Sequence, residues 1–281
     1  MANIIDGKAL AEQIRNSIKQ KVAKLKKKPG LAVVMVGEHP ASKVYVNFKA
    51  KACEEVGFHS EEHKLPEDAT EARVLQVIDQ LNRDTNIHGI LVQLPLPKHI
   101  NEKNIQAAVS PSKDVDGFHP YNEGRLLIGD PTFIPCTPKG IIKLINSTGM
   151  QILGKNVAIV GKSNIVGKPI SILLLNMGAT ITVCHRETKD LGGMTRQADI
   201  LIVAAGKPGL ISAEMVKEHA IVIDVGVNRV NDKVVGDVDF ETVKEKAGFI
   251  TPVPGGVGPM TIACLLENTL EAYERMEERK S

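Results

Sequence analysis

The hydrophobic and polar positions of this chain alternate in a way that predicts strands separated by helices. Short, nearly continuous apolar runs predict buried strands at residues 31–36, 87–94, 157–160, 179–183, 200–205 and 221–225. Apolar residues at helical spacing predict helices at residues 6–27, 42–56, 70–81, 139–147 and after Thr261. This alternation is typical of α/β proteins, and nearly continuous apolar strands are typical of parallel sheets covered on both faces.

The strand predicted at residues 157–160 ends in a glycine-rich turn. Gly161 and Gly167 flank this turn, and Pro169 begins a further helix-like stretch. A helix N-terminus at such a place offers unpaired backbone N–H groups and a partial positive charge to a phosphate. The spacing, Gly-x-Ser-x-x-x-Gly, differs from the usual dinucleotide fingerprint, and a glycine after a strand also commonly makes a simple turn.

The strands that follow this turn favour the phosphate-binding interpretation. Gly206 and Gly226 close two of them, as Gly161 closes the first. In doubly wound sheets, ligands bind beyond the carboxyl ends of the strands, where these glycines fall. The sequence therefore predicts a Rossmann-like domain with a doubly wound parallel sheet that binds a dinucleotide.

The helix predicted at residues 42–56 carries a lysine on its apolar face. Ser42 suits the N-cap of this helix and Gly57 suits its C-terminal end. At about 100° per residue, this face carries Tyr45, Lys49, Ala52, Cys53 and Val56. If its stem reaches the surface, Lys49 is an ordinary helix residue. If its ammonium is buried, its pKa is lowered and it can act as a base near neutral pH. The spacing alone leaves both interpretations open.

The segment from His59 to His63 fits the letters of an inverted zinc-protease motif, His-x-x-Glu-His. A metal site of that type requires a long amphipathic helix, whereas this segment is short, polar and followed by Pro66. We interpret it as a partly exposed strand, and neither the histidines nor the cysteines indicate a metal site.

Other polar residues follow predicted strands or precede predicted helices. Gln93 closes an apolar strand, as an ordinary edge residue or as a hydrogen-bond partner for a substrate or a catalytic ammonium. Asp114 and Asp116 precede a glycine, which favours a turn. Thr137 and Pro138 suit the N-cap and the first position of a helix.

Composition narrows the class of function. A chain of 281 residues is long enough for two cores, and 43% apolar residues is typical of a globular protein. A net charge of +2 and 3% aromatic residues argue against a nucleic-acid partner. Four cysteines without a Cys-x-x-Cys pair predict reduced thiols and a cytoplasmic location. No apolar run suits a signal peptide or a membrane span.

Several segments together resemble the bifunctional methylenetetrahydrofolate dehydrogenase/methenyltetrahydrofolate cyclohydrolase family. They are PASKVYVNFKAKACEEVG, GILVQLPLP, PSKDVDGFHPYNEGRL, PCTPKG, VGKSNIVGKP and TPVPGGVGPMT, and they span nearly the whole chain in the family's order. The resemblance implies NADP-dependent oxidation of 5,10-methylenetetrahydrofolate, followed by hydrolysis to 10-formyltetrahydrofolate. It also implies a cytoplasmic homodimer that serves one-carbon metabolism and purine biosynthesis, with a folate substrate and no membrane partner.

The resemblance further implies a division into two domains. Residues 1–140 would form a catalytic folate-binding domain, completed by a C-terminal helix at residues 261–281. Residues 141–260 would form an NADP-binding Rossmann-like domain across a cleft.

Positions carried over from the family give a set of expected site residues. The resemblance implies that Lys49 is the catalytic lysine, that Tyr45 orients folate and lysine, that Gln93 partners the lysine, and that Asp116 holds the pterin. The implied substrate-binding residues are Tyr45, Lys49, Val92, Gln93, Leu94, Asp116, Pro254, Gly255, Gly256, Val257 and Gly258. The implied cofactor contacts are Gly161, Lys162, Ser163 and Val227. Many relatives carry arginine in place of Lys162, and lysine lacks the planar fork that grips a phosphate with two hydrogen bonds.

The residues after the second strand of the Rossmann-like domain bear on the choice of cofactor. NAD enzymes usually carry an acid about 20 residues beyond the glycine turn. Here Cys184, His185 and Arg186 occupy that region, although Glu187 is close. Arg186 and Lys162 together suit a 2′-phosphate, so we predict a preference for NADP.

Two other functions fit a chain of this shape. One is a different NADP-linked dehydrogenase, acting on a hydroxy or amino acid, which would not require Tyr45 and Lys49 together with Asp116. The other is a dinucleotide-binding sensor without catalysis, which would not turn over any folate.

Overall fold

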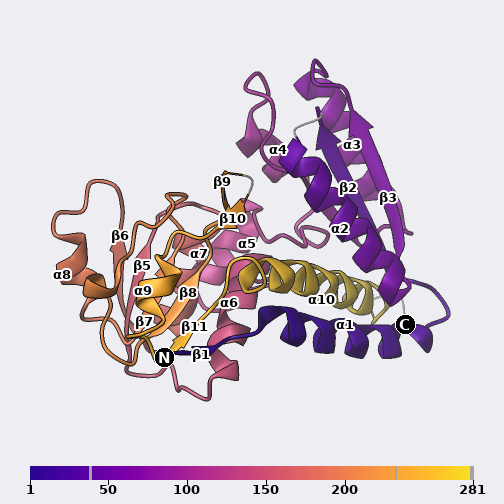
Figure 1. Ribbon diagram of the computed structural model, residues 1–281. Coiled ribbons are helices and arrows are strands. Elements are labelled where there is room, and N and C mark those ends of the chain that lie inside the picture. The colour runs from indigo at the N-terminus through magenta and orange to yellow at the C-terminus, as the bar shows by residue number, and fades with distance from the viewer. Residues whose placement is uncertain (38–39, 232, 279–281) are drawn as a thin grey trace. The chain divides into compact units, whose positions relative to one another are not determined.

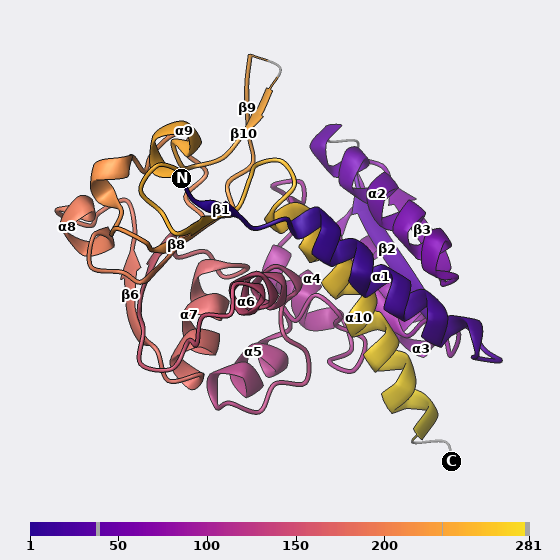
Figure 2. The ribbon, with the colours of Figure 1, turned by 60° about the horizontal axis from the view of Figure 1, so that its bottom comes forward.

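The computed structural model divides the chain into two compact units (Figures 1 and 2). It describes residues 1–37, 40–231 and 233–278, without the side chains of residues 40–45. Unit 1 comprises Met1–Ala11 and Thr137–Thr261, and unit 2 comprises Glu12–Cys136 and Ile262–Ser281. The predicted division placed residues 1–11 with the folate-binding residues. The structure places them in unit 1, because β1 (Asn3–Ile4) pairs with β11 (Phe249–Ile250).

Unit 1 contains a six-stranded sheet in the order β1-β11-β8-β7-β5-β6, and all of its strand pairs are parallel. The predicted strands are β5 (Asn156–Val160), β6 (Thr180–Cys184), β7 (Ile200–Val203) and β8 (Ile221–Asp224). From β5 the chain extends the sheet to β6 on one side and to β7 and β8 on the other. This reversal confirms the predicted doubly wound sheet and places a topological switch point beside β5.

The central strands β5, β7 and β8 of unit 1 are buried on both faces, whereas β6, which was predicted as a buried strand, is largely exposed because it is the last strand of the sheet. Ala158, Leu201 and Val222 pack into one buried cluster with residues such as Val243 of α9. The intervening residues, including Ile159, are buried as well. The other elements of this unit are α6 (Cys136–Ser147), α7 (Gly167–Asn176), α8 (Leu191–Thr195), a 3₁₀ turn (Ala213–Met215), α9 (Phe240–Val243) and the antiparallel hairpin β9 (Asn228–Val230) and β10 (Lys233–Val235).

Unit 2 contains a three-stranded parallel sheet in the order β3-β2-β4. Its elements are β2 (Gly30–Val36), α2 (Pro40–Val56), β3 (His59–Leu65), α3 (Glu71–Arg83), β4 (Gly89–Val92), α4 (Glu102–Ala108), α5 (Pro120–Leu127) and most of α1 (Gly7–Ala23) and α10 (Val257–Glu278), whose first residues belong to unit 1. Alternate residues of β2 enter different clusters. Leu31 and Val33 pack with residues of α1, α2 and α10, whereas Ala32 and Val34 pack with residues of α3 and α4. The apolar run of β2 is therefore explained by helices on both faces.

The C-terminal helix contributes much of the unit 2 core. Leu265, Leu266, Leu270 and Tyr273 of α10 share a buried cluster with Ile18 of α1. Figures 1 and 2 both show α1 and α10 side by side. None of the helices in the described part of the chain is long and apolar enough to cross a membrane.

Several helix starts differ from the predicted ones, among them that of α7, which begins at Gly167 and not at Pro169. α2 begins at Pro40, since proline suits the first turn, and the side chain of Ser42 lies outside the described residues. α6 begins at Cys136, so Thr137 is not its N-cap, and its hydroxyl is 2.9 Å from that of Thr261. α10 begins at Val257, before Thr261. The predicted start of α3 agrees, because the Thr70 hydroxyl accepts a hydrogen bond from Arg73 N.

Candidate active site

Lys49 lies on the face of α2 that packs against the unit 2 core. Ala52, Cys53 and Val56 on this face are buried, and the Lys49 side chain is half-buried. Its Nζ donates a hydrogen bond to Gln93 Oε1 at 2.9 Å. The other end of the same amide, Gln93 Nε2, donates to the carbonyl of Leu94 at 2.8 Å. The amide of Gln93 therefore presents an oxygen to the lysine.

Burial shifts the pKa of both charged groups in this part of unit 2. Burial lowers the pKa of Lys49, and the negative charge of Asp116 opposes part of that shift. Burial raises the pKa of Asp116, and the positive charge of Lys49 opposes part of that shift. Both changes favour the uncharged forms, so a neutral amine becomes available closer to neutral pH than for a free lysine.

The turn that carries Asp116 is held by a buried aspartate. The Asp114 carboxylate accepts hydrogen bonds from the N–H groups of Phe118 (3.2 Å) and His119 (2.8 Å), and from Asn122 Nδ2 (2.8 Å). The predicted turn after Asp114 and Asp116 is therefore stabilised by hydrogen bonds within the same segment of the chain.

A residue of the C-terminal helix also hydrogen-bonds to the turn that carries Asp116. Asn268 of α10 is fully buried, and its Nδ2 donates to the carbonyls of Val115 (2.8 Å) and Ile134 (2.9 Å). Asn268 was not among the residues predicted from the sequence. An amide within the apolar stripe of the predicted C-terminal helix was the available signal.

A buried thiol completes the surroundings of Asp116. Cys136 Sγ donates to the carbonyl of Val115 at 3.3 Å. Burial raises the pKa of Cys136 well above its ordinary value, and the charge of Asp116 raises it further, so the thiol stays protonated. From the sequence, Cys136 was predicted only as one of four reduced cysteines, and all four are buried thiols outside any disulfide.

The turn after β5 requires glycine at positions 161 and 167. A Cβ on Gly161 would fall on the carbonyl oxygen of Ala204, and Gly161 has φ +130°. A Cβ on Gly167 would fall on the carbonyl oxygen of Gly161. This compact turn leaves Lys162 and Ser163 exposed just before α7, which suits the phosphates of a dinucleotide.

The predicted cofactor contacts lie at the carboxyl ends of the strands of the unit 1 sheet, called here its carboxyl edge. The turn at Gly161 follows β5, Arg186 follows β6, and Val227 follows β8. Because the strands are parallel, their carboxyl ends share this edge. The Arg186 side chain is 94% exposed and its Nε is 3.0 Å from Glu187 Oε1, and Val227 is 55% exposed.

The remaining predicted substrate contacts are divided between the units. Val92 and Leu94 are half-buried beside Gln93 in unit 2. The residues Pro254, Gly255, Gly256, Val257 and Gly258 belong to unit 1, where the last two begin α10. Tyr45 belongs to α2, and its side chain lies outside the described residues.

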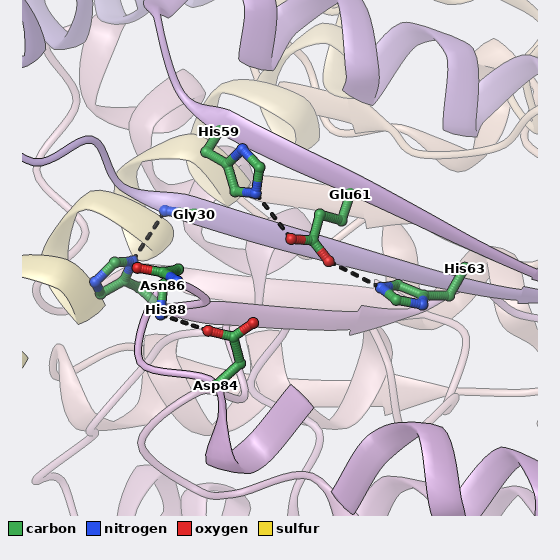
Figure 3. Close-up of polar contacts among 7 residues, drawn as sticks. All are labelled: Gly30, His59, Glu61, His63, Asp84, Asn86 and His88. Carbon is green, nitrogen blue, oxygen red and sulfur yellow. Dashed lines mark hydrogen bonds and ion pairs between the residues drawn. The ribbon is translucent and has the colours of Figure 1, made fainter. Parts of the chain in front are cut away.

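The predicted exposed strand with two histidines is β3 (Figure 3). His59 Nε2 and His63 Nε2 lie 2.8 Å and 3.1 Å from the two carboxylate oxygens of Glu61. The motif's own glutamate, Glu62, is instead paired with Lys64. Within the described ranges, no group of three or more His, Cys, Asp or Glu side chains is arranged to hold a metal ion.

Figure 3 also shows His88, which is buried and comes just before β4, whereas Gln93 comes just after that strand. His88 Nδ1 accepts a hydrogen bond from the Gly30 N–H at 2.9 Å, at the start of β2. This contact joins the amino ends of two strands and stabilises the sheet.

The doubly wound sheet and the glycine turn at its switch point define unit 1 as a dinucleotide-binding domain of the Rossmann type. Residues 135–277 match the family described as "Tetrahydrofolate dehydrogenase/cyclohydrolase, NAD(P)-binding domain", and residues 5–116 match its "catalytic domain". The chain belongs to the tetrahydrofolate dehydrogenase/cyclohydrolase family.

Individual relatives are similar over almost the entire chain. The "Bifunctional protein FolD" of Moorella thermoacetica is 58% identical over 278 residues, which cover 98% of this chain and 99% of that protein. The crystal structure of the bifunctional enzyme FolD from Campylobacter jejuni is 52% identical with a TM-score of 0.96, covering 98% of this chain and 100% of that one. The enzyme of Trypanosoma brucei, complexed with NADP and an inhibitor, is 38% identical with a TM-score of 0.96, covering 98% of each chain.

Proposed function

We propose that this protein oxidises 5,10-methylenetetrahydrofolate to 5,10-methenyltetrahydrofolate with NADP and then hydrolyses the product to 10-formyltetrahydrofolate. The observation that carries the proposal is the hydrogen bond between Lys49 Nζ and Gln93 Oε1 in a half-buried part of unit 2. Membership of the family and the name of the relative from Campylobacter jejuni support both activities.

In the oxidation, the protein positions the reactants. NADP, when bound, accepts a hydride from the methylene carbon of the folate. No protein base is required for that transfer, so orientation supplies much of the rate. We assign Asp116 to hold the pterin, and Tyr45 and Lys49 to orient the folate with Val92, Leu94 and the segment 254–258.

In the hydrolysis, a protein group must accept a proton. Water forms a bond to the methenyl carbon, and the neutral amine of Lys49 takes the proton that the water releases. The C–N5 bond of the adduct then breaks as its hydroxyl becomes the formyl carbonyl, N5 takes up the hydroxyl proton, and the formyl group stays on N10. The Gln93 oxygen holds the amine in place, and burial keeps part of the Lys49 population neutral by lowering its pKa.

We assign the cofactor to the carboxyl edge of unit 1. The turn from Gly161 to Ser163 would hold the phosphates, Val227 would contact the cofactor beyond β8, and Lys162 and Arg186 would meet a 2′-phosphate. The exposure of both cations and the NADP complex of the relative from Trypanosoma brucei support NADP over NAD.

We also propose a division of labour between the domains. Folate binding belongs to the predicted first domain, residues 1–140 with the C-terminal helix 261–281, except that residues 1–11 pair with the sheet of unit 1. NADP binding belongs to residues 141–260. The burial of Asn268 against the turn of Asp116 supports the inclusion of the C-terminal helix in the folate-binding domain.

We propose that the protein is a homodimer in the cytoplasm and supplies formyl groups for purine biosynthesis. β6 lies at the edge of the unit 1 sheet, and Leu175, Met177 and Val183 near this edge are exposed. Unpaired edges of this kind bind a second strand. Size-exclusion chromatography with light scattering should give twice the mass of the 30.4 kDa chain, and Val183→Lys should give the monomer. A monomeric parent protein would contradict the dimer.

The decisive experiment follows both products. The protein is incubated with 5,10-methylenetetrahydrofolate and either NADP or NAD, and absorbance is recorded for NADPH or NADH and for methenyltetrahydrofolate. We expect turnover with NADP, followed by loss of the methenyl signal. Turnover only with a hydroxy or amino acid would indicate another dehydrogenase, and cofactor binding without any turnover would indicate a sensor.

A further inference from the structure

A fully buried aspartate lies behind the turns at the carboxyl edge of unit 1. Asp237 Oδ2 accepts hydrogen bonds from the N–H groups of Ala205 (2.7 Å) and Gly206 (2.8 Å), which follow β7. Its Oδ1 accepts a hydrogen bond from Asn228 Nδ2 at 2.8 Å, in the segment that follows β8. One carboxylate therefore fixes two turns that come from different strands.

A second buried aspartate holds the first in place. Asp224 Oδ1 accepts hydrogen bonds from the N–H groups of Gly226 (2.9 Å) and Asp237 (3.0 Å), and its Oδ2 accepts one from Val238 (3.0 Å). The N–H of Asp224 donates to Thr251 Oγ1 at 2.8 Å. Burial raises the pKa of Asp224 to about 6, and the backbone N–H groups oppose that shift, so the carboxylate is charged at neutral pH.

The packing around these carboxylates leaves no room for side chains. A Cβ on Gly226 would fall on the carboxylate carbon of Asp237, and a Cβ on Gly236 would fall on Asp224 Oδ2. Gly226 and Asn228, which contact the two aspartates, are the direct neighbours of Val227. The backbone on both sides of the exposed Val227 is therefore held by hydrogen bonds to carboxylates, a buried one at Gly226 and a partly buried one at Asn228.

We propose that Asp237 is a positioning residue for the cofactor, which sets the backbone of the turns after β7 and β8. The inference rests on the proposed function, since it concerns NADP bound at this edge. The N–H groups of Ala205 and Gly206 point to Asp237 and are not available to a phosphate. The cofactor therefore contacts the side of these turns that faces away from Asp237. Asp237 determines the backbone conformation of that side.

Exchange of the two partners tests this role. Asn228→Asp places a second carboxylate against Asp237, and Asp237→Asn weakens the acceptor for Ala205 and Gly206. In the double variant, the amide introduced at position 237 keeps its oxygen toward those N–H groups and donates to the carboxylate introduced at position 228. Asp199→Asn is the matched control, because Asp199 accepts a hydrogen bond from the Asn156 N–H at the opposite edge of the same sheet.

Each variant is titrated with NADP by isothermal titration calorimetry, and KM and kcat are measured for the NADP-dependent oxidation. Hydrolysis of methenyltetrahydrofolate without cofactor reports whether unit 2 remains intact. We expect each single variant to raise Kd and KM for NADP about 10- to 100-fold, the range for loss of a charge-assisted hydrogen bond, with a smaller change in kcat. The double variant should recover most of that loss, which additive effects would not do.

Four results would overturn the proposal. The first two are single variants with the parent's Kd for NADP, and a double variant whose loss is the sum of the single losses. The other two are a loss of hydrolysis in parallel with the loss of NADP binding, and an increase in Kd for Asp199→Asn equal to that for Asp237→Asn. If the parent protein neither binds NADP nor oxidises methylenetetrahydrofolate, the proposed function itself fails.

Discussion

The two candidate sites of this protein are built from different parts of the chain. In unit 2, side chains form the site, and burial shifts the pKa of Lys49, Asp116 and Cys136. In unit 1, the edge consists of backbone turns with exposed Lys162 and Arg186, and the buried carboxylates lie behind it.

The difference follows from what each site is proposed to do. Proton transfer needs a group whose pKa is close to the working pH, and burial moves the pKa of Lys49 in that direction. Binding an anionic dinucleotide needs a backbone of fixed shape and cations that remain free to contact it. Changes in unit 2 should therefore alter the rate of hydrolysis, and changes in unit 1 should alter the affinity for NADP.

The largest effect is expected from Lys49→Met, which keeps the side-chain stem and removes the amine. Hydrolysis of methenyltetrahydrofolate should fall by about 10²–10⁴-fold, the contribution of a positioned base, while NADP-dependent oxidation remains measurable. Lys51→Met, on the exposed side of α2, is the control. Hydrolysis at the parent rate in Lys49→Met would show that Lys49 is an ordinary helix lysine.

The rate of hydrolysis and the stability of the protein should both depend on pH through Lys49. Because burial lowers the pKa of Lys49, the rate of hydrolysis should fall about tenfold per pH unit below that lowered pKa, as the amine becomes protonated. The folded state binds this proton less tightly than the unfolded state, so stability should rise with pH between the lowered pKa and about 10.4. Lys49→Met should flatten both profiles, measured by initial rates and by urea unfolding. An unchanged hydrolysis profile would contradict the assignment.

Gly161→Ala should affect the cofactor and spare the hydrolysis. A Cβ at this residue meets the carbonyl oxygen of Ala204, so the turn must shift, and KM for NADP should rise about 10- to 100-fold. Gly154→Ala is a matched control, because Gly154 also has a positive φ but has no atom within 4 Å of a Cβ. Equal effects of the two substitutions on KM would argue against a cofactor at the Gly161 turn.

Arg186→Ala should produce a smaller and more selective effect. Loss of one charge-assisted contact at an exposed residue should raise KM for NADP about tenfold and leave KM for NAD nearly unchanged. Glu187→Gln is the companion variant, since it releases Arg186 from its ion pair. Parallel initial-rate measurements with the two cofactors distinguish the outcomes, and equal effects on both would reject Arg186 as the 2′-phosphate contact.

The smallest catalytic effect is expected from Asn268→Ala in the C-terminal helix. It leaves the carbonyls of Val115 and Ile134 without this donor, so the free energy of unfolding should fall by about 1–3 kcal/mol. KM for the folate should rise modestly and KM for NADP should not change, as measured by urea unfolding and steady-state kinetics. An unaltered free energy of unfolding would show that α10 does not hold the turn of Asp116.

Much of the fold was predictable because its periodicity is local. The apolar runs of β5 to β8 predicted a doubly wound parallel sheet, and the helical stripe on α2 placed Lys49 toward the core. Helix ends were less predictable: Thr137, the expected N-cap of α6, lies inside that helix, and its hydroxyl is 2.9 Å from that of the distant Thr261. The pairing of β1 with β11 was missed because the two residues of β1 carry too little pattern to predict a strand.

The sequence by itself determined that Lys49 lies on the apolar face of a helix and that Gly161 lies in a turn after a strand. Both conclusions follow from the spacing of neighbouring residues. The family resemblance implied Gln93 as the partner of Lys49. Only the tertiary structure decided which residues hold the turns beside the two sites. The partners of Val115 and Gly206 lie 153 and 31 residues away, at Asn268 and Asp237. Such contacts form when buried polar groups must find hydrogen-bond partners as the core closes, and no local pattern of residues encodes that requirement.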